Sequence, residues 1–309
     1  MADALLGRVR ATGLLAADAD VLVLLSGGRD SVCLLDVAVA LGCRARALHV
    51  NYGLREGAAG DEAHCRALCD RLAVELEVEA ARRPDDAPGN LQAWARDVRY
   101  AAAARAAGGG LVAVGHTASD QAETVLYRLA VSPGRRALLG MEPRSGRLVR
   151  PLLTVTREET AAWCRARGLA WRDDPTNDSE MYARSRVRGG LVPALEAVDP
   201  RAQANVVRTA QILREEAEVL DVVVDTALAG RDGIALEHLA ELPPALARLV
   251  VRRLAEATAG TLCPRAAARL DDILALGPAG ALDVGDGARA VVEAGVLRFT
   301  ATPPPVPRA

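Results

Sequence analysis

Apolar and polar residues alternate along the chain in two ways, and the difference predicts its secondary structure. Short apolar runs predict strands at 21–25, 44–50, 74–79 and 111–114. Apolar residues at helical spacing predict helices at 3–16, 32–38, 60–72, 90–105, from 120 onwards and at 156–168. Strands that alternate with helices predict an α/β fold with a doubly wound, mostly parallel sheet.

The pattern changes after residue 200, where helical periodicity continues with few strand-like runs. It predicts helices at 201–228, 237–258 and 264–276, and strand character at 288–300. We therefore expect a first domain at 1–195, a second, smaller and mostly helical domain at 200–302, and a disordered tail at 303–309. Residues 131–150 are rich in Gly, Pro, Ser and Arg, which predicts a mobile connection.

The most informative stretch follows the first predicted strand and precedes a helix. Two glycines there allow positive φ and a close backbone approach, and the amides of such a turn bind anions. The stretch is not a Walker P-loop, because the chain contains no lysine. The alternative is an ordinary glycine-rich turn capped by serine. We favour a phosphate-binding loop made of Ser26, Gly27, Gly28, Arg29, Asp30 and Ser31.

A second group of polar residues follows the strand at 111–114. Asp120 and Glu123 lie three residues apart in a first helical turn, so their carboxylates share one face. With Asp30 they are candidate Mg²⁺ ligands beside bound phosphates. Alternatively, they only stabilise the helix N-terminus. His116 lies at the strand end, either as a nucleotide-binding residue or as a structural hydrogen-bonding group.

Composition adds one feature to this picture. The formal net charge of −2 does not itself indicate a nucleic-acid-binding protein, but all 38 basic residues are arginines. Guanidinium groups pair bidentately with phosphates, so arginine clusters can bind RNA in a near-neutral chain. The alternative is a set of solvated charges paired with nearby acids. Candidate substrate-binding residues are Arg96, Arg99, Arg135, Arg150, Arg184 and Arg186.

The cysteine pattern and the N-terminus indicate the compartment. Six cysteines are scattered without any C-x-x-C pair, so reduced thiols are expected rather than disulfides or a zinc site. No signal peptide is apparent, and the run at 21–25 is too short to span a bilayer. We expect a cytoplasmic protein without a membrane partner.

Several stretches agree in order with one family. The loop at 26–31 resembles the pyrophosphate loop (PP-loop) of the N-type ATP pyrophosphatases. Further similar motifs are H-V-N-Y-G-L-R at 49–55, A-R-x-x-R-Y at 95–100, G-H-x-x-x-D-Q-x-E-T at 115–124, L-x-G-M at 138–141, R-P-L-L at 150–153, and D-P-T-N with R-x-R-x-R at 174–188. Together they resemble the tRNA(Ile)-lysidine synthetases over about residues 20–195. Tyr52 and Thr117 stand where that family usually has His.

The resemblance implies a two-step ligation. ATP adenylates C2 of the wobble cytidine in the CAU anticodon of tRNA(Ile), and free L-lysine then displaces AMP to give lysidine. It implies ATP as co-substrate, Mg²⁺ as cofactor, and Asp30, Asp120 and Glu123 as catalytic residues. The second domain is then expected to interact with tRNA. Another PP-loop enzyme, of the tRNA-thiolation type, is the alternative. Pairing with a second copy of the chain is left open.

Overall fold

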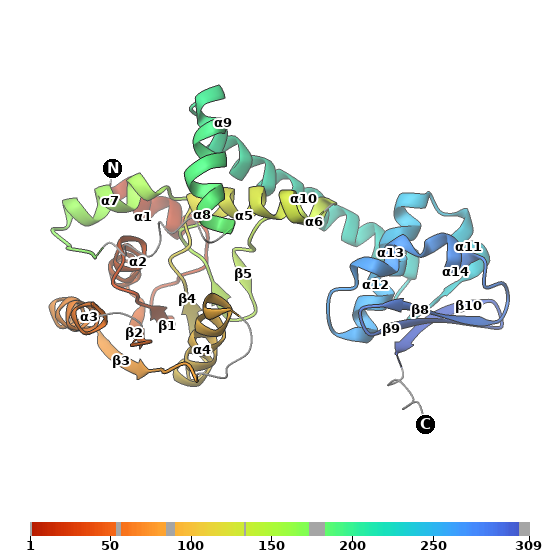
Figure 1. Cartoon of the computed structure of the whole chain (residues 1–309), viewed down its shortest axis with the longest axis horizontal. Helices are drawn as coiled ribbons and strands as arrows, with labels where there is room; N and C mark the ends of the chain where they lie inside the picture. Colours follow the sequence, from red (N-terminus) through yellow and green to blue (C-terminus); the bar gives the residue numbers. More distant parts are fainter. Residues whose placement is uncertain (1, 54–56, 85–89, 133, 173–182, 303–309) are drawn as a thin grey trace. The chain divides into compact units, whose positions relative to one another are not determined.

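The structure, a computed structural model, describes residues 2–53, 57–84, 90–132, 134–172 and 183–302. They form two compact units, Met1–Leu213 and Arg214–Ala309 (Figure 1). The 303–309 tail, Leu54 and Arg55 of the second motif, and the D-P-T-N loop lie outside the described residues. None of the described helices is long and apolar enough to cross a membrane.

The described part of the first unit contains a six-stranded sheet with the order β3-β2-β1-β4-β6-β5. All neighbouring strands pair in parallel except β5, which is antiparallel to β6. The predicted mostly parallel sheet is therefore confirmed. The strands are β1 (Asp20–Leu24), β2 (Arg44–Asn51), β3 (Glu75–Ala80), β4 (Leu111–Ala113), β5 (Arg144–Ser145) and β6 (Leu148–Val149).

Helices cover both faces of this sheet, because successive side chains of a strand point to opposite sides. Val21 and Val23 pack in one apolar core with α1, α2 and α7, whereas Leu22 and Leu24 pack in another with α4. Figure 1 shows α2 and α4 on opposite sides of the sheet. The helices are α1 (Ala2–Ala11), α2 (Arg29–Ala40), α3 (Ala58–Leu72), α4 (Leu91–Ala106), α5 (Ala118–Val131), α6 (Arg135–Leu138), α7 (Arg157–Ala166), α8 (Ala183–Arg186), the π-helical η2 (Val187–Leu191), α9 (Val192–Val198) and α10 (Ala202–Leu228), which continues into the second unit.

One expectation for this unit was wrong. The described part of 131–150 is not an irregular connection, since it contains α6, β5 and β6. It is held by Gln121, whose amide oxygen accepts from the backbone N–H of Met141 at 2.6 Å and whose amide nitrogen donates to the Met141 carbonyl at 2.9 Å. The helix predicted to begin near Asp120 is present as α5, which starts at Ala118: Thr117 is its N-cap, and Asp120 closes a capping box with it.

The second unit combines helices with a small antiparallel sheet of order β7-β10-β9-β8. The predicted helix at 237–258 is divided at Pro243–Pro244, because proline lacks an N–H and restricts the residue before it. The strand character at 288–300 is a hairpin, and β8 was not predicted. The elements are β7 (Ile234–Ala235), α11 (Leu236–Glu241), α12 (Pro244–Ala259), α13 (Pro264–Ala268), α14 (Leu270–Leu274), β8 (Gly280–Gly285), β9 (Ala288–Glu293) and β10 (Val296–Ala301).

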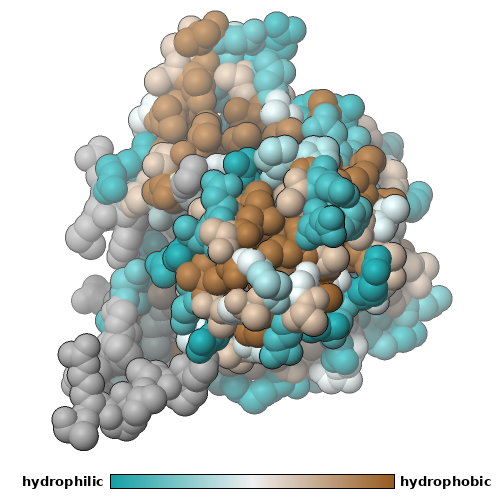
Figure 2. All heavy atoms as spheres, turned by 90° about the vertical axis from the view of Figure 1, so that its right-hand side faces the viewer, coloured by the Kyte–Doolittle hydropathy of each residue, from teal (hydrophilic) through white to brown (hydrophobic). Residues whose placement is uncertain are grey.

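The surface of the second unit is partly apolar. Val219 and Val222 on α10, and Leu262 after α12, are among its large hydrophobic residues with at least 65% exposure. Figure 2 shows apolar side chains gathered on one face, with hydrophilic side chains around them. Apolar atoms make up much of any protein surface, so we assign this face no role.

Candidate active site

The loop at 26–31 leaves the carboxyl end of β1 and enters α2. Gly27 has φ +84°, a conformation that side chains other than glycine rarely adopt. The two serines tie the turn together: the Ser31 hydroxyl donates to the Gly28 carbonyl at 2.8 Å and lies 3.1 Å from the Ser26 hydroxyl. The first turn of α2 also presents N–H groups that have no intrahelical acceptor. Such a helix start is suited to bind an anion.

Gly115 explains how the segment at 115–124 reaches this loop. A Cβ atom added to Gly115 would lie 2.9 Å from the carbonyl oxygen of Asp30, closer than real Cβ contacts allow. The chain that leaves β4 therefore passes directly against the first turn of α2. This contact brings the start of α5, with Asp120, next to Asp30.

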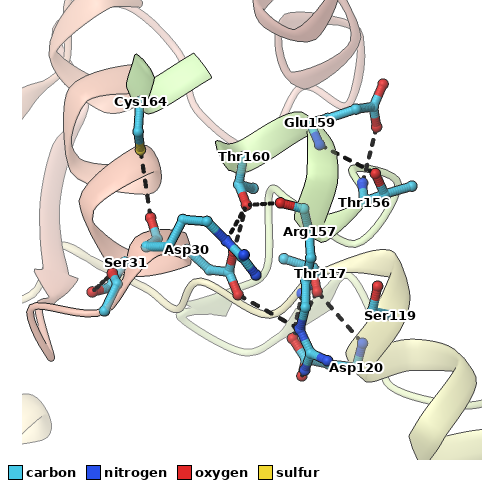
Figure 3. Close-up of polar contacts among 12 residues, drawn as sticks. Asp30, Ser31, Thr117, Ser119, Asp120, Thr156, Arg157, Glu159, Thr160 and Cys164 are labelled. Carbon is cyan, nitrogen blue, oxygen red and sulfur yellow. Dashed lines mark hydrogen bonds and ion pairs between the residues drawn. The ribbon is translucent and has the colours of Figure 1, made fainter. Parts of the chain in front are cut away.

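Arg157 lies at the centre of the acidic residues. This first residue of α7 donates from one terminal nitrogen to Oδ1 of Asp120 at 2.7 Å and from the other to Oε1 of Glu123 at 2.9 Å. Its Nε lies 4.0 Å from Oδ2 of Asp30. Figure 3 shows Arg157 between Asp30 and Asp120. One guanidinium thus connects the phosphate-loop helix with α5.

Two further side chains complete this network. Thr160, fully buried on α7, donates to Oδ1 of Asp30 at 2.5 Å. Arg188 on η2 donates two hydrogen bonds to Glu123, from Nε to Oε1 at 2.7 Å and from a terminal nitrogen to Oε2 at 3.1 Å. The Glu123 side chain is only 5% exposed, so this bidentate pair neutralises a buried charge.

The electrostatics of the network favour charged side chains. Burial raises the pKa of Asp120, but the charge of Arg157 and the hydrogen bonds from Thr117 outweigh it and hold the pKa below its ordinary value. Burial lowers the pKa of Arg157, and the charges of Asp120 and Glu123 reverse that effect and raise it. Both partners therefore remain ionised at neutral pH.

The predicted three-carboxylate metal set does not fit this arrangement. Carboxylate oxygens are ligands that Mg²⁺ prefers. However, the described residues contain no group of three acidic, His or Cys side chains close enough to hold a metal ion. The guanidinium of Arg157 lies between the carboxylates instead. Of the three carboxylates, Asp30 fits a cation best, because the hydrogen bonds that it accepts from described residues end on Oδ1 and Oδ2 faces only Nε of Arg157 at 4.0 Å.

The remaining predicted residues occupy different parts of the unit. His116 follows β4 close to Asp120, and its charge contributes to the lowered pKa of that carboxyl. Arg96 and Arg99 lie on α4 and Arg150 follows β6, and the three gather around Tyr100. Arg135 begins α6. Arg184 and Arg186 lie on α8, where the side chain of Arg184 is outside the described structure.

Sequence reasoning missed Arg157 and Thr160 and did not select Arg188 as a site residue. One local signal was available for Arg157: Thr156 and Glu159 form a capping box, which fixes Arg157 as the first residue of α7. A cation is unfavourable at that position because of the helix dipole. Such an arginine needs carboxylates from elsewhere in the fold.

Comparison with known proteins adds to this geometry. Residues 7–195 match a family described as the PP-loop domain. The chain is 37% identical to the tRNA(Ile)-lysidine synthase of Leifsonia xyli subsp. xyli over 309 residues, which cover 92% of this chain and 91% of that protein. It is 39% identical to that of Thermobifida fusca over 279 residues, covering 86% and 85%.

Other relatives are longer or more distant. The tRNA(Ile)-lysidine synthase of Thermus thermophilus is 39% identical over 252 residues, which cover 78% of this chain and 49% of that protein. The chain therefore spans about half the length of that relative. Among solved structures, the U34-tRNA thiolase NcsA of Methanococcus maripaludis is similar, with a TM-score of 0.59, 19% identity, and coverage of 69% of this chain and 78% of that one. At this identity the likeness concerns the fold alone.

Proposed function

This chain belongs to the tRNA(Ile)-lysidine synthase family of PP-loop proteins, and we propose that it is an ATP-dependent ligase that converts a cytidine of tRNA(Ile) to lysidine. The observation that carries the proposal is the 37% identity over 92% of this chain and 91% of its Leifsonia relative. The fold supports it, because the loop at 26–31 and the start of α5 meet at the carboxyl edge of the sheet, where open α/β folds bind ligands.

The reaction has two steps. The C2 oxygen of the wobble cytidine in the CAU anticodon attacks the α-phosphate of ATP, and pyrophosphate leaves. The amine of free lysine then attacks C2, and AMP leaves with that oxygen. Adenylation thus converts a poor leaving oxygen into a good one. The target base must leave its stack to reach the ATP site.

The loop at 26–31 acts in the first step, the adenylation. Backbone N–H groups at the start of α2 and the hydroxyls of Ser26 and Ser31 bind the β- and γ-phosphates and stabilise the departing pyrophosphate. Bound Mg²⁺ would supply further charge neutralisation, with Asp30 as its protein ligand. Thr160 and Arg29 hold Oδ1 of Asp30, which orients Oδ2.

Asp120 and Glu123 act in the second step. Lysine must lose a proton before its amine attacks, and three bases were candidates: Asp120, Glu123 and His116. Arg157 keeps Asp120 ionised with a lowered pKa, so we assign Asp120 an electrostatic role. Glu123 is likewise held by Arg157 and Arg188, so His116 is the remaining candidate for the proton acceptor.

The tRNA partner is bound by arginines outside the acidic network and by the second unit. Arg135, Arg184 and Arg186 lie on the short helices α6 and α8. Guanidinium groups in such segments suit a phosphodiester backbone. We assign the helices of the second unit to contacts with parts of the tRNA outside the anticodon.

The thiolation alternative is weaker. The chain carries six free cysteines, and every one except Cys43 is buried. Burial raises the pKa of Cys65 to about 12 and that of Cys69 to about 11, so these thiols stay protonated and are poor nucleophiles or cluster ligands.

One experiment tests the proposal. The enzyme is incubated with a tRNA(Ile) transcript carrying CAU, ATP, Mg²⁺ and lysine, and the digested tRNA is examined by mass spectrometry. We expect lysidine, and ATP–pyrophosphate exchange that requires the tRNA but not lysine. Omission of lysine should remove only the product. Absence of both exchange and product would overturn the assignment, and incorporation of sulfur from a donor would replace it with thiolation.

A further inference from the structure

Three arginines from two distant segments surround the ring of Tyr100. The guanidinium carbon of Arg96 lies 4.7 Å from the ring centroid, and that of Arg99 lies 5.7 Å from it. Arg150, which follows β6, is near enough that the Tyr100 phenol and the Arg96 charge both act on it. The side chains therefore form one group, which we call the Tyr100 cluster: Arg96, Arg99, Tyr100 and Arg150.

The Tyr100 cluster contains buried polar atoms without partners. Nε of Arg99 and Nε of Arg150 are buried and make no hydrogen bond within the described chain. Arg150 is only 8% exposed: a terminal nitrogen donates to the backbone carbonyl of Glu142 at 2.6 Å, and the side chain also bonds to Tyr100. Each buried polar group without a partner costs about 1–3 kcal/mol. A fold that keeps two of them together is suited to a ligand that accepts hydrogen bonds.

The charge of the cluster is also uncompensated. Within the described residues, no carboxylate forms an ion pair with Arg96, Arg99 or Arg150. Burial lowers the pKa of Arg150 below its ordinary value and the charge of Arg96 adds to this effect, while Tyr100 and Glu142 oppose it without reversing it. By contrast, Arg105 on the same helix is paired with Glu79 at 2.7 Å. A ligand of the cluster must therefore be an anion.

The position of the cluster separates it from the ATP phosphates. The loop at 26–31 leads into α2, which packs on the face of the sheet that carries Val21 and Val23. The helix of the cluster, α4, packs on the opposite face. Arg150 nevertheless follows the end of the parallel strand β6, so the cluster reaches the same carboxyl edge. A substrate that extends beyond the nucleotide would meet it there.

We propose that the Tyr100 cluster binds a phosphodiester group of the RNA strand, next to the nucleotide that is modified. This inference rests on the proposed function, because it takes tRNA as the substrate. Exposed Arg96 and half-buried Arg99 supply guanidinium groups for the phosphate oxygens. Tyr100 holds both arginines over its ring and reduces their freedom before RNA binds.

The test measures how tRNA binding depends on salt. A labelled CAU transcript is titrated by fluorescence anisotropy at several KCl concentrations with the wild type and with the double variant Arg96→Gln/Arg99→Gln. Each lost single-strand phosphate contact should lower the slope of log K against log [KCl] by about 0.7, so we expect a slope lower by about 1.4. The double variant Arg96→Lys/Arg99→Lys should retain most of the slope, since it retains the charges.

A matched control removes two paired surface arginines, Arg66→Gln and Arg105→Gln. We expect an unchanged slope for it. An unchanged slope for the Arg96/Arg99 variant, or an equal loss of slope in the control, would overturn the phosphodiester-binding role of the Tyr100 cluster. Lysidine formation by the wild type would then still support the proposed function. A wild type that binds no tRNA would overturn both. If the double variant unfolds, the exposed single variant Arg96→Gln, with an expected loss of about 0.7, takes its place.

Discussion

Arg157 donates a hydrogen bond of 2.7 Å to Asp120, and this bond joins the first turns of α7 and α5. A cation in the first turn of a helix is disfavoured by the helix dipole, whereas an anion there is favoured. The unfavourable position of Arg157 is offset by the carboxylates that it faces. The pair therefore acts as a link between helices, with Glu123 and Asp30 beside it.

Replacement of Arg157 should lower both stability and activity. Arg157→Gln leaves two largely buried carboxylates with Arg188 alone, so we expect the free energy of unfolding to fall by about 2–4 kcal/mol. ATP–pyrophosphate exchange should fall more than tenfold, because Asp30 and Asp120 lose their common partner. Arg157→Lys should recover part of the stability but less of the activity, since it lacks the planar fork.

The matched control for Arg157 is Arg165→Gln, which removes an exposed charge from the same helix. It should change the free energy of unfolding by less than about 0.5 kcal/mol in a urea titration. Equal effects of the two substitutions would contradict the central position of Arg157.

The effect of Arg157 should depend on pH. The pKa of Asp120 lies below its ordinary value of 3.8 in the folded chain, so its ionised form stabilises the fold above that pH. This contribution is lost as pH falls through the folded pKa. The difference in unfolding free energy between wild type and Arg157→Gln should therefore be largest near neutral pH and shrink towards about pH 3. Urea titrations across this range measure it, and a difference independent of pH would contradict the ion pair.

Asp30 should be essential for adenylation but not for folding. Its side chain is 21% exposed and bound through Thr160 and Arg29, so Asp30→Asn keeps the volume and loses the charge. We expect tRNA-dependent ATP–pyrophosphate exchange below a tenth of the wild-type rate, with an unchanged thermal midpoint. Asp70→Asn, an exposed acid on α3, is the control. Exchange above a tenth would count against a cation at Asp30.

Gly115 should tolerate no larger residue. Gly115→Ala places a Cβ atom 2.9 Å from the Asp30 carbonyl, so the start of α2 must move. We expect a loss of about 1–3 kcal/mol in unfolding free energy and weaker ATP binding. Gly7→Ala on α1 meets nothing within 4 Å and should instead stabilise the chain by about 0.5–1 kcal/mol. A stable, fully active Gly115→Ala enzyme would contradict the close contact between Gly115 and the start of α2.

The sequence by itself determined the local features of this protein. The helix predicted at 90–105 begins at Asn90, whose side chain caps it by accepting from the N–H of Ala93 at 2.7 Å. The alternation of strands and helices predicted the parallel sheet, because side-chain periods follow directly from backbone geometry. The turn at 26–31 was also predictable, since its glycines and its position between a strand and a helix can be identified from the sequence alone.

Only the tertiary structure decided which distant side chains meet. Arg157 and Thr160 reach Asp30 because α7 packs on α2, and Arg150 joins Arg96 because β6 pairs with β4 beside α4. The acidic residues expected around a metal ion form ion pairs with arginines instead, and no local sequence pattern predicts these pairs. Sequence spacing constrains neighbours within a few residues, whereas ion pairs across the fold depend on strand order, register and helix packing.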